Sequence, residues 1–326
     1  MKLQHLLLVC LISAASRAAE LRLGMIGLDT SHATDFTHLI NDAANPHHVP
    51  GARVVAAVKA SSPDIESSYG RVDAYTRELT EKWGVTLMGS VEELCAAVDA
   101  VLIESVDGRP HLAQARPVFQ ARKPLFIDKP LAGSLKDAVE IYKLAKATQT
   151  PCFTSSAYRF YDSMAELKKS DVGRVRGALS YGPGPKEQHH PDLFWYAVHP
   201  SEALFTVLGR GCRSVTRVSA QDADVITGLW TEDRTGVLVA LRTKATPHQV
   251  TLFGEKAVAQ QKPGGDSYAP LVREIIKFFQ TGLAPVSLEE SIELFAFMEA
   301  ADESKRRGGT PVSIHEVLKK NGWEEK

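Results

Sequence analysis

The chain has 326 residues, with 38 lysines and arginines against 39 aspartates and glutamates, so its formal net charge is −1. This length accommodates two domains of ordinary size. The even charge balance and the lack of a basic tract argue against a nucleic-acid partner. The sequence contains neither repeats nor low-complexity segments, and it therefore predicts a globular protein.

The first residues differ in character from the rest of the chain. Lys2 precedes an apolar run over residues 6–15, and Ser16-Arg17-Ala18 supplies the small residues that a signal peptidase requires. The run is too short to span a bilayer comfortably as a mature helix. We therefore expect residues 1–19 to be a secretory signal peptide, and the protein to be periplasmic or secreted with no membrane attachment after cleavage.

The cysteines are few and widely spaced. Cys10 would leave with the signal peptide, while Cys95, Cys152 and Cys212 would remain. They form neither a CxxC metal motif nor a full disulfide set. The spacing favours buried free thiols and leaves a single bridge open.

Apolar strand-like segments alternate with helix-like segments up to about residue 150. Residues 21–27 and 52–58 are predicted strands, and a helix pattern follows the first of them from about Asp35. Ser90 and Glu93 form the capping box of another helix. Residues 98–105 are a further buried strand. This alternation predicts a Rossmann-like nucleotide-binding domain with a doubly wound parallel sheet over residues 20–150.

The strand from Leu125 to Ile127 ends in Asp128-Lys129-Pro130. Pro130 disfavours the helical conformation at the residue before it, so Lys129 is held at a rigid strand-to-helix corner. Ligands bind at the carboxyl ends of strands in open α/β sheets. An ammonium there can polarise a hydroxyl or carbonyl oxygen or exchange a proton. Taken alone, a surface Lys-Pro turn explains the tripeptide equally well.

The pattern changes after residue 150. A series of strands with few long helices between them predicts an α+β domain over residues 151–326, with a mostly antiparallel sheet whose open face is free for a ligand or another subunit. Helices return from Ser267 onward. The strands are expected at residues 175–181, 214–220, 225–230, 236–242 and 249–253, and the later helices at 289–304 and 313–320.

The run from Asp107-Gly108-Arg109-Pro110-His111 through Arg122-Lys123-Pro124 to Asp128-Lys129-Pro130 resembles the glucose–fructose oxidoreductase and inositol dehydrogenase family (Gfo/Idh/MocA). The resemblance extends over nearly the whole chain after the first twenty residues. It implies an NAD(P)-dependent oxidoreductase acting on a CH–OH group of a sugar, polyol or sugar derivative. It also implies C-terminal helices that pack back on the first domain and a homo-oligomer formed through the open sheet.

The nucleotide turn departs from the Gly-x-Gly-x-x-Gly pattern of this family. Only Gly27 is kept, and Asp29 and His32 replace the second and third glycines. A carboxylate there repels a pyrophosphate and its side chain blocks close approach. Lys59 stands where an acid would hold the ribose, which either indicates NADP or is an ordinary surface position. The resemblance implies that the NAD or NADP site consists of Gly27, Asp29, Thr30, Ser31, His32, Lys59, Ser105, His111 and Asp128.

Export raises a question about this cofactor, because a chain secreted unfolded carries no cofactor with it. The protein would either capture a nucleotide and retain it tightly through turnovers, or would have lost it and kept a sugar-sized pocket. Two alternatives to the oxidoreductase therefore stay open. One is a glycoside hydrolase or lyase that oxidises its substrate transiently with a retained NAD, and the other is a non-catalytic carbohydrate-binding protein.

The family carries Asp-x-Gly-x-His-x-x-Asp on a helix of the second domain. The matching stretch here places His199 at the histidine and Glu202 at the final acid, while Trp195 replaces the first acid. By resemblance, Lys129, His199 and Glu202 are the catalytic residues. His199 would act as general acid/base, and Lys129 would stabilise the developing charge on oxygen. A helix histidine that Glu202 merely holds in place is the structural alternative.

The resemblance also implies that Tyr158 and Arg159 face the substrate pocket, together with Tyr196 and with Asp192 as a substitute for the missing acid. A structural ion pair is an equally good interpretation of Arg159. The types of His189, His190, Asp192, His199 and Glu202 suit zinc, but their spacing is not diagnostic. We therefore predict a site without a metal.

Overall fold

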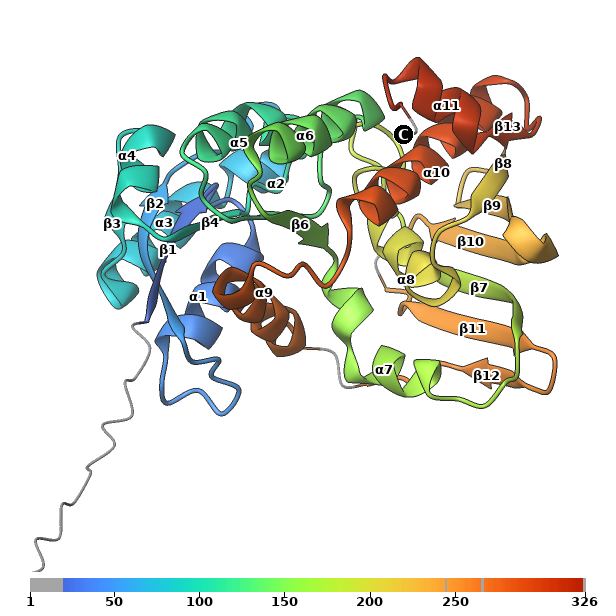
Figure 1. Cartoon of the computed structure of the whole chain (residues 1–326), viewed down its shortest axis with the longest axis horizontal. Helices are drawn as coiled ribbons and strands as arrows, with labels where there is room; N and C mark the ends of the chain where they lie inside the picture. The colour runs from blue at the N-terminus through green and yellow to red at the C-terminus, as the bar shows by residue number, and fades with distance from the viewer. Residues whose placement is uncertain (1–19, 244, 265–266, 325–326) are drawn as a thin grey trace, which may run out of the picture.

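Six short parallel strands form the first sheet, and they alternate along the chain with helices. The computed structural model describes residues 20–243, 245–264 and 267–324 (Figure 1). The predicted signal peptide and Cys10 lie outside these described residues. The strand order is β3-β2-β1-β4-β5-β6. The strands are β1 (Leu21–Ile26), β2 (Ala52–Val58), β3 (Thr86–Leu87), β4 (Ala100–Ile103), β5 (Leu125–Asp128) and β6 (Cys152–Ser155).

Helices cover this sheet because its central strands are apolar on both faces; every residue of β4 and of β5 is buried. Helices α4, α5 and α6 pack side by side, and α1 packs against α3. The helices of the first domain are α1 (Ser31–Asn41), α2 (Glu66–Tyr69), α3 (Val72–Trp83), α4 (Val91–Ala97), α5 (His111–Gln120) and α6 (Leu135–Thr148). The switch in strand order between β1 and β4 places a crevice at the carboxyl edge of the sheet.

The second sheet has seven strands in the order β12-β11-β7-β10-β9-β8-β13. Its pairings are antiparallel except between β10 and β7, which are parallel. The strands are β7 (Val175–Pro183), β8 (Cys212–Ser219), β9 (Ala223–Trp230), β10 (Thr235–Leu241), β11 (Gln249–Gly254), β12 (Val258–Gln260) and β13 (Val312–Ser313). The fold class predicted from the sequence is confirmed in both halves.

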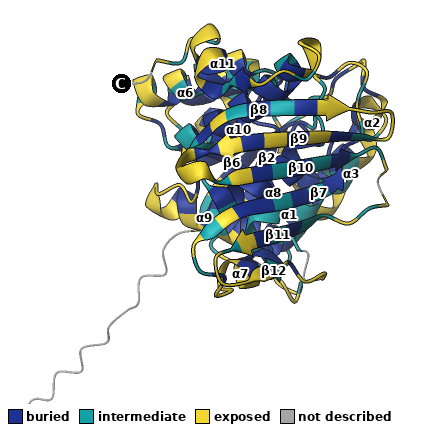
Figure 2. Cartoon of the chain, turned by 90° about the vertical axis from the view of Figure 1, so that its right-hand side faces the viewer, coloured by how far each residue is buried: buried dark blue, intermediate teal, exposed yellow. Residues whose placement is uncertain are grey.

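Helices α8 and α10 contact one face of the second sheet and leave the other open. Along β9 and β10, buried residues alternate with exposed or half-buried ones, because successive side chains point to the covered and to the open face in turn (Figure 2). Helix α9 contacts α1, and α10 contacts α6, so the C-terminal helices join the two sheets. The remaining elements are α7 (Asp162–Lys168), α8 (Val198–Leu208), α9 (Ala269–Thr281), α10 (Leu288–Arg306), α11 (Ile314–Lys320) and the short 3-10 helices η1 (Ala157–Phe160) and η2 (Thr231–Asp233).

The local signals read from the sequence hold at several boundaries. Ser90 caps α4 by accepting from the Glu93 N–H at 3.1 Å, while the Glu93 side chain reaches the Gly89 N–H at 2.8 Å. Helix α1 begins at Ser31, four residues before the predicted start near Asp35, because Thr30 supplies the N-cap. Cys95, Cys152 and Cys212 are buried free thiols, as the spacing favoured. Among the described residues, we find no helix with the length and apolar character needed to cross a bilayer.

Candidate active site

The turn after β1 touches the loop after β4 at Gly27. This residue has a φ of +85°, and a Cβ on it would lie 2.2 Å from Ser105 Oγ and 2.5 Å from the Ser105 backbone nitrogen. Only glycine fits such a contact. Thr30 then caps α1, since its hydroxyl accepts from the His32 N–H at 3.4 Å. The first glycine of the expected turn therefore has a clear steric role here.

A cavity of about 290 Å³ opens at this carboxyl edge, between the first domain and the helices that follow it. Its walls hold seven of the residues predicted from the sequence, including Lys129 from the first sheet and His199 from α8. Its lining residues are Thr30, Ser31, His32, Ser67, Arg71, Val106, Lys129, Ala157, Tyr158, Tyr161, Trp195, Tyr196, His199 and Tyr268.

Lys129 reaches the cavity from the corner after β5. Its Nζ lies 3.4 Å from Asp128 Oδ2, and its side chain is 12% exposed. Asp128 is fully buried and accepts a 2.8 Å hydrogen bond from His32 Nδ1. Burial alone would raise the pKa of Asp128, but His32 and Lys129 lower it to about 2. The carboxylate therefore stays charged and holds the ammonium at the cavity wall.

His199 lies on the first turn of α8 and is nearly buried. Its Nδ1 is 2.8 Å from Ser156 Oγ, and its ring meets Tyr158 and Tyr196 edge-on at centroid distances of 5.2 and 4.9 Å. Burial, and next the positive charge of Lys129, lower the pKa of His199 well below its usual 6.5. The imidazole is therefore neutral near pH 7 and can accept a proton.

Glu202 and Arg159 hold each other rather than line the cavity. Arg159 Nε donates to Glu202 Oε1 at 2.6 Å, and its Nη2 lies 2.7 Å from Glu290 Oε1. Ser155 Oγ donates to the same Glu202 oxygen at 2.9 Å. Burial opposes the charge, but the two glutamates raise the pKa of Arg159. His199 is held by Ser156, so neither the catalytic role predicted for Glu202 nor its alternative role as partner of His199 is reflected in these contacts.

Asp29 turns away from the cavity. Its carboxylate is buried and accepts from the Val106 N–H at 3.0 Å and from Ser68 Oγ at 2.5 Å. Burial raises the pKa of Asp29 despite these two hydrogen bonds. The carboxylate at the second glycine position therefore ties the β1 turn to α2 and to the β4 loop, and it does not point at a ligand in the cavity.

The other predicted nucleotide residues lie around the edge without lining the cavity. Ser105 accepts at its carbonyl from the His111 ring, 2.9 Å away, and its hydroxyl bonds Gln114. Lys59 is exposed and pairs with Asp73 at 2.5 Å. Ser105 and His111 thus shape the β4 loop, while Lys59 belongs to the surface.

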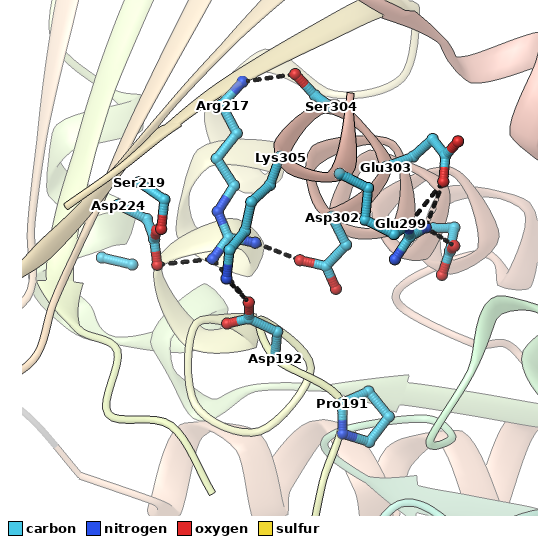
Figure 3. A network of polar contacts seen from close by, with 12 residues as sticks. Pro191, Asp192, Arg217, Ser219, Asp224, Glu299, Asp302, Glu303, Ser304 and Lys305 are labelled. Atoms are coloured by element: carbon cyan, nitrogen blue, oxygen red, sulfur yellow. Dashed lines mark hydrogen bonds and ion pairs between the residues drawn. The ribbon is translucent and has the colours of Figure 1, made fainter. Parts of the chain in front are cut away.

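Asp192 lies in a different polar cluster (Figure 3). It contacts Arg217 Nη2 at 3.0 Å and Lys305 Nζ at 2.8 Å. Burial works against ionisation, but these two cations lower the pKa of Asp192 to about 2. The same Arg217, fully buried on β8, also contacts Asp224 at 2.8 Å and Asp302. The structure therefore does not bring Asp192 to the cavity with Tyr158 and Tyr196.

The five residues considered for zinc do not come together. His189 is exposed beside Glu187, and His190 Nε2 faces Asp107 at 3.6 Å. Within the described residues, a cluster of metal-binding side chains forms elsewhere, from His32, Glu104 and Asp128.

Several cavity residues were not predicted from the sequence. Ser67 and Arg71 come from α2 and the cap of α3, and Tyr161 and Tyr268 from distant segments. His248, in the loop before β11, lies behind the cavity with its ring 3.9 Å from that of Tyr158, and burial lowers the pKa of His248 to about 4. Neither spacing nor motif marks these positions, because tertiary packing alone brings them together.

Comparison with known proteins finds oxidoreductases among the proteins that this chain resembles. Residues 21–156 match the model of the Gfo/Idh/MocA family, described as an oxidoreductase family with an NAD-binding Rossmann fold. Two inositol 2-dehydrogenases from strains of Cereibacter sphaeroides are 33% identical over 193 residues and 30% identical over 145 residues. These matches cover 58% and 44% of this chain, but 47% and 38% of the relatives. The chain thus spans about half the length, or less, of the curated relatives it matches.

Comparison with solved structures finds likeness over more of this chain than sequence comparison does. The scyllo-inositol dehydrogenase from Lactobacillus casei with bound NAD(H) and scyllo-inositol has a TM-score of 0.74 at 14% identity, covering 91% of this chain and 100% of that one. GenD2 from gentamicin A biosynthesis in complex with NAD has a TM-score of 0.73 at 15% identity, covering 90% and 96%. At these identities the likeness shows a shared fold.

Proposed function

We propose that this chain is an NAD(P)-dependent dehydrogenase of the Gfo/Idh/MocA family that oxidises a CH–OH group of a sugar, polyol or related molecule. One observation carries the proposal. Lys129 from the first sheet and His199 from α8 line the same cavity, Lys129 with Asp128 3.4 Å from its Nζ and His199 with a pKa lowered by burial and by Lys129. The inositol 2-dehydrogenase relatives support an inositol-like substrate.

The residues present fit a dinucleotide at this edge. Thr30 and Ser31 at the N-terminus of α1 face the cavity together with Arg71, which is a suitable setting for a pyrophosphate. The carboxylate of Asp29 is turned away and hydrogen-bonded, so it does not repel an anion at close range. Lys59 pairs with Asp73, so a ribose 2′-phosphate would have to displace that acid. We therefore propose NAD as the preferred cofactor.

When bound, the oxidised nicotinamide supplies the acceptor for a hydride from the substrate carbon. The chain supplies the proton chemistry at the same carbon. Neutral His199 takes the proton from the reacting hydroxyl, and Ser156 fixes the orientation of its ring. The Lys129 ammonium, anchored by Asp128, stabilises negative charge as it develops on the oxygen. Tyr158, Tyr196 and Tyr268 offer flat apolar faces and hydroxyl edges, which suit a ring that bears both C–H and O–H groups.

The proposal is tested by mixing purified protein with NAD⁺ or NADP⁺ and a panel of inositols and sugars, and following the absorbance of the reduced nicotinamide. We expect turnover with NAD⁺, and loss of turnover in Lys129→Met with nucleotide binding retained. Failure of both nucleotides to bind in calorimetry, at millimolar concentration, would contradict the proposal.

We also propose that the protein is exported, supported by the charged start, apolar run and small residues within 1–19. Export favours the second candidate function, a hydrolase or lyase with a retained NAD, because it needs no outside supply of cofactor. Native mass spectrometry of protein from the periplasm would reveal a retained dinucleotide. Release of sugar from a nitrophenyl glycoside without net nicotinamide reduction would favour this second candidate over the dehydrogenase.

We further propose a homo-oligomer formed through the open face of the second sheet. Large apolar side chains are exposed there, and a soluble monomer rarely gathers many of them on one face. Light scattering on the purified protein would test it, since a monomer at high concentration contradicts the proposal. The exposed residues are Val218, Val225, Leu229, Phe253 and Val258, with exposures between 39% and 70%.

A further inference from the structure

Three buried side chains meet at the carboxyl edge of the first sheet. His32 comes from the first turn of α1, Glu104 follows β4, and Asp128 ends β5. One ligand atom from each lies within 4.8 Å of the others. Glu104 and Asp128 are 0% exposed and His32 is 6% exposed. The topology therefore collects one imidazole and two carboxylates in a space that water barely reaches.

The polar atoms of this cluster are incompletely paired. Both Glu104 oxygens and Asp128 Oδ1 have no hydrogen-bond partner among the residues that the structure describes. Lys129 provides one positive charge near Asp128, at 3.4 Å, against two carboxylates. A buried ionised carboxylate without a partner is strongly destabilising, because it has lost its hydration and gained nothing in return. Something that is positively charged or that donates hydrogen bonds must meet these three oxygens in the working protein.

We propose that His32, Glu104 and Asp128 form a binding site for one divalent metal ion of the Zn²⁺, Mn²⁺ or Fe²⁺ class. Imidazole nitrogen with carboxylate oxygen is the ligand set these ions accept. Two ligands about 2.1 Å from one tetrahedral ion lie roughly 3.4 Å apart. The His32 Nδ1 to Asp128 Oδ2 distance of 2.8 Å therefore needs only a small shift to admit the ion.

The surroundings already fix the ligands. The His32 ring stacks on Phe36 at 5.2 Å and meets Tyr268 edge-on at 4.6 Å, so its plane is set before any ion arrives. The ion would neutralise the two carboxylates that lie beside the N-terminus of α1. This inference goes beyond the proposed dehydrogenase activity and does not depend on it.

A proton is the competing occupant. Burial, and next the negative charge of Asp128, raise the pKa of Glu104 in the metal-free protein. A single proton, however, provides one O–H group for three unpaired oxygens, whereas a divalent ion can coordinate oxygens from both carboxylates at once. The number of unpaired atoms therefore favours the metal ion.

The test begins with the metal content of the full chain, purified without a polyhistidine tag and without chelators. Elemental analysis should find about one ion per chain. After chelator treatment, calorimetric titration with Zn²⁺ and Mn²⁺ separately should restore one site. Co²⁺ in the same site should give a visible absorption spectrum of a nitrogen- and oxygen-ligated ion. These readouts need no catalytic activity, so they stand even if the proposed dehydrogenase function fails.

Glu104→Gln keeps the shape of the side chain and removes its charge. We expect it to weaken binding of the better ion by about 100-fold or more, and His32→Gln to weaken it similarly. Glu92→Gln, on the exposed side of α4, is the matched control and should bind like the unaltered chain. Absence of a stoichiometric ion in the unaltered chain at saturation overturns the proposal, whatever the variants do. Equal affinity in a folded Glu104→Gln variant also overturns it. A protonated-carboxyl infrared band that disappears in Glu104→Gln would assign the site to a proton.

Discussion

Two buried polar clusters of this protein differ in how fully they are paired. Around Arg217, the carboxylates of Asp192, Asp224 and Asp302 each have a cationic partner (Figure 3). At the edge of the first sheet, neither oxygen of Glu104 accepts a hydrogen bond from any residue in the described part of the chain. Arg217 and Asp224 in one cluster, and Glu104 and Asp128 in the other, are cut off from water, so an unpaired charge on any of them is costly.

The difference separates a structural role from a functional one. A cluster in which each carboxylate has a cation from the chain beside it holds its elements together. A cluster with unmatched charges beside a cavity is suited to a ligand or to chemistry. The first should therefore respond to mutation through stability, and the second through binding and activity.

The largest stability effect is expected at Arg217. Arg217→Met removes the ion-pair partner of Asp302 and one cation each from Asp192 and Asp224, and it should lower the free energy of unfolding by roughly 3–5 kcal/mol. Urea denaturation measures this. Arg213→Met, on the same strand, removes an exposed pair with Asp233 and should cost less than about 1 kcal/mol. Similar losses of unfolding free energy in both variants would contradict the expected difference between buried and surface ion pairs.

Lys129→Met should act on turnover. Removing the ammonium that stabilises the developing oxyanion should lower kcat by roughly 10²- to 10⁴-fold, while circular dichroism still shows the folded protein. Lys136→Met, at an exposed position of α6, serves as the control and should retain full activity. A Lys129→Met enzyme within threefold of the unaltered one would remove this residue from the chemistry.

The pH profile tests His199. A general base works when it is deprotonated, and the pKa of His199 is lowered by burial and by Lys129. Activity should therefore persist as pH falls through 6.5, with the acid limb of kcat/KM below that value. A midpoint at or above 6.5 would contradict the assignment. The charged or titratable groups that face His199 are Lys129, His32, His248, Tyr158 and Tyr196.

The smallest effect is expected at Ser156, which positions the His199 ring. Ser156→Ala removes one hydrogen bond and should lower kcat by about tenfold with little change in KM. Ser163→Ala removes a hydroxyl that bonds Gln261 instead, and kcat should stay unchanged. A fall in KM alone, or equal losses in both variants, would argue against a positioning role.

The sequence predicted the parts of the site that depend on local chain chemistry. Lys129 and His199 were both predicted by resemblance to the family, and both line the cavity. Arg159 and Asp192 were expected at the substrate. Instead, each meets a partner far along the chain, Glu202 in one case and Lys305 in the other.

Such pairings cannot be read from spacing, since they depend on which helix crosses which strand. For the same reason, the sequence did not indicate a role for Glu104, an acid at the end of an otherwise apolar strand. The fold of the sheet places it beside Asp128. Asp29 shows the reverse. Its identity predicted conflict with a nucleotide, but the direction of its side chain removes that conflict.

Arg159 joins three elements, since it lies in η1 and contacts Glu202 of α8 and Glu290 of α10. Helix α10 in turn contacts α6 of the first domain. These contacts are made within the chain itself, so the walls that carry Lys129 and His199 are preorganised. The entropy cost of bringing the two walls together is borne by folding and not by ligand binding. The rigid site can therefore discriminate between ligands by their shape.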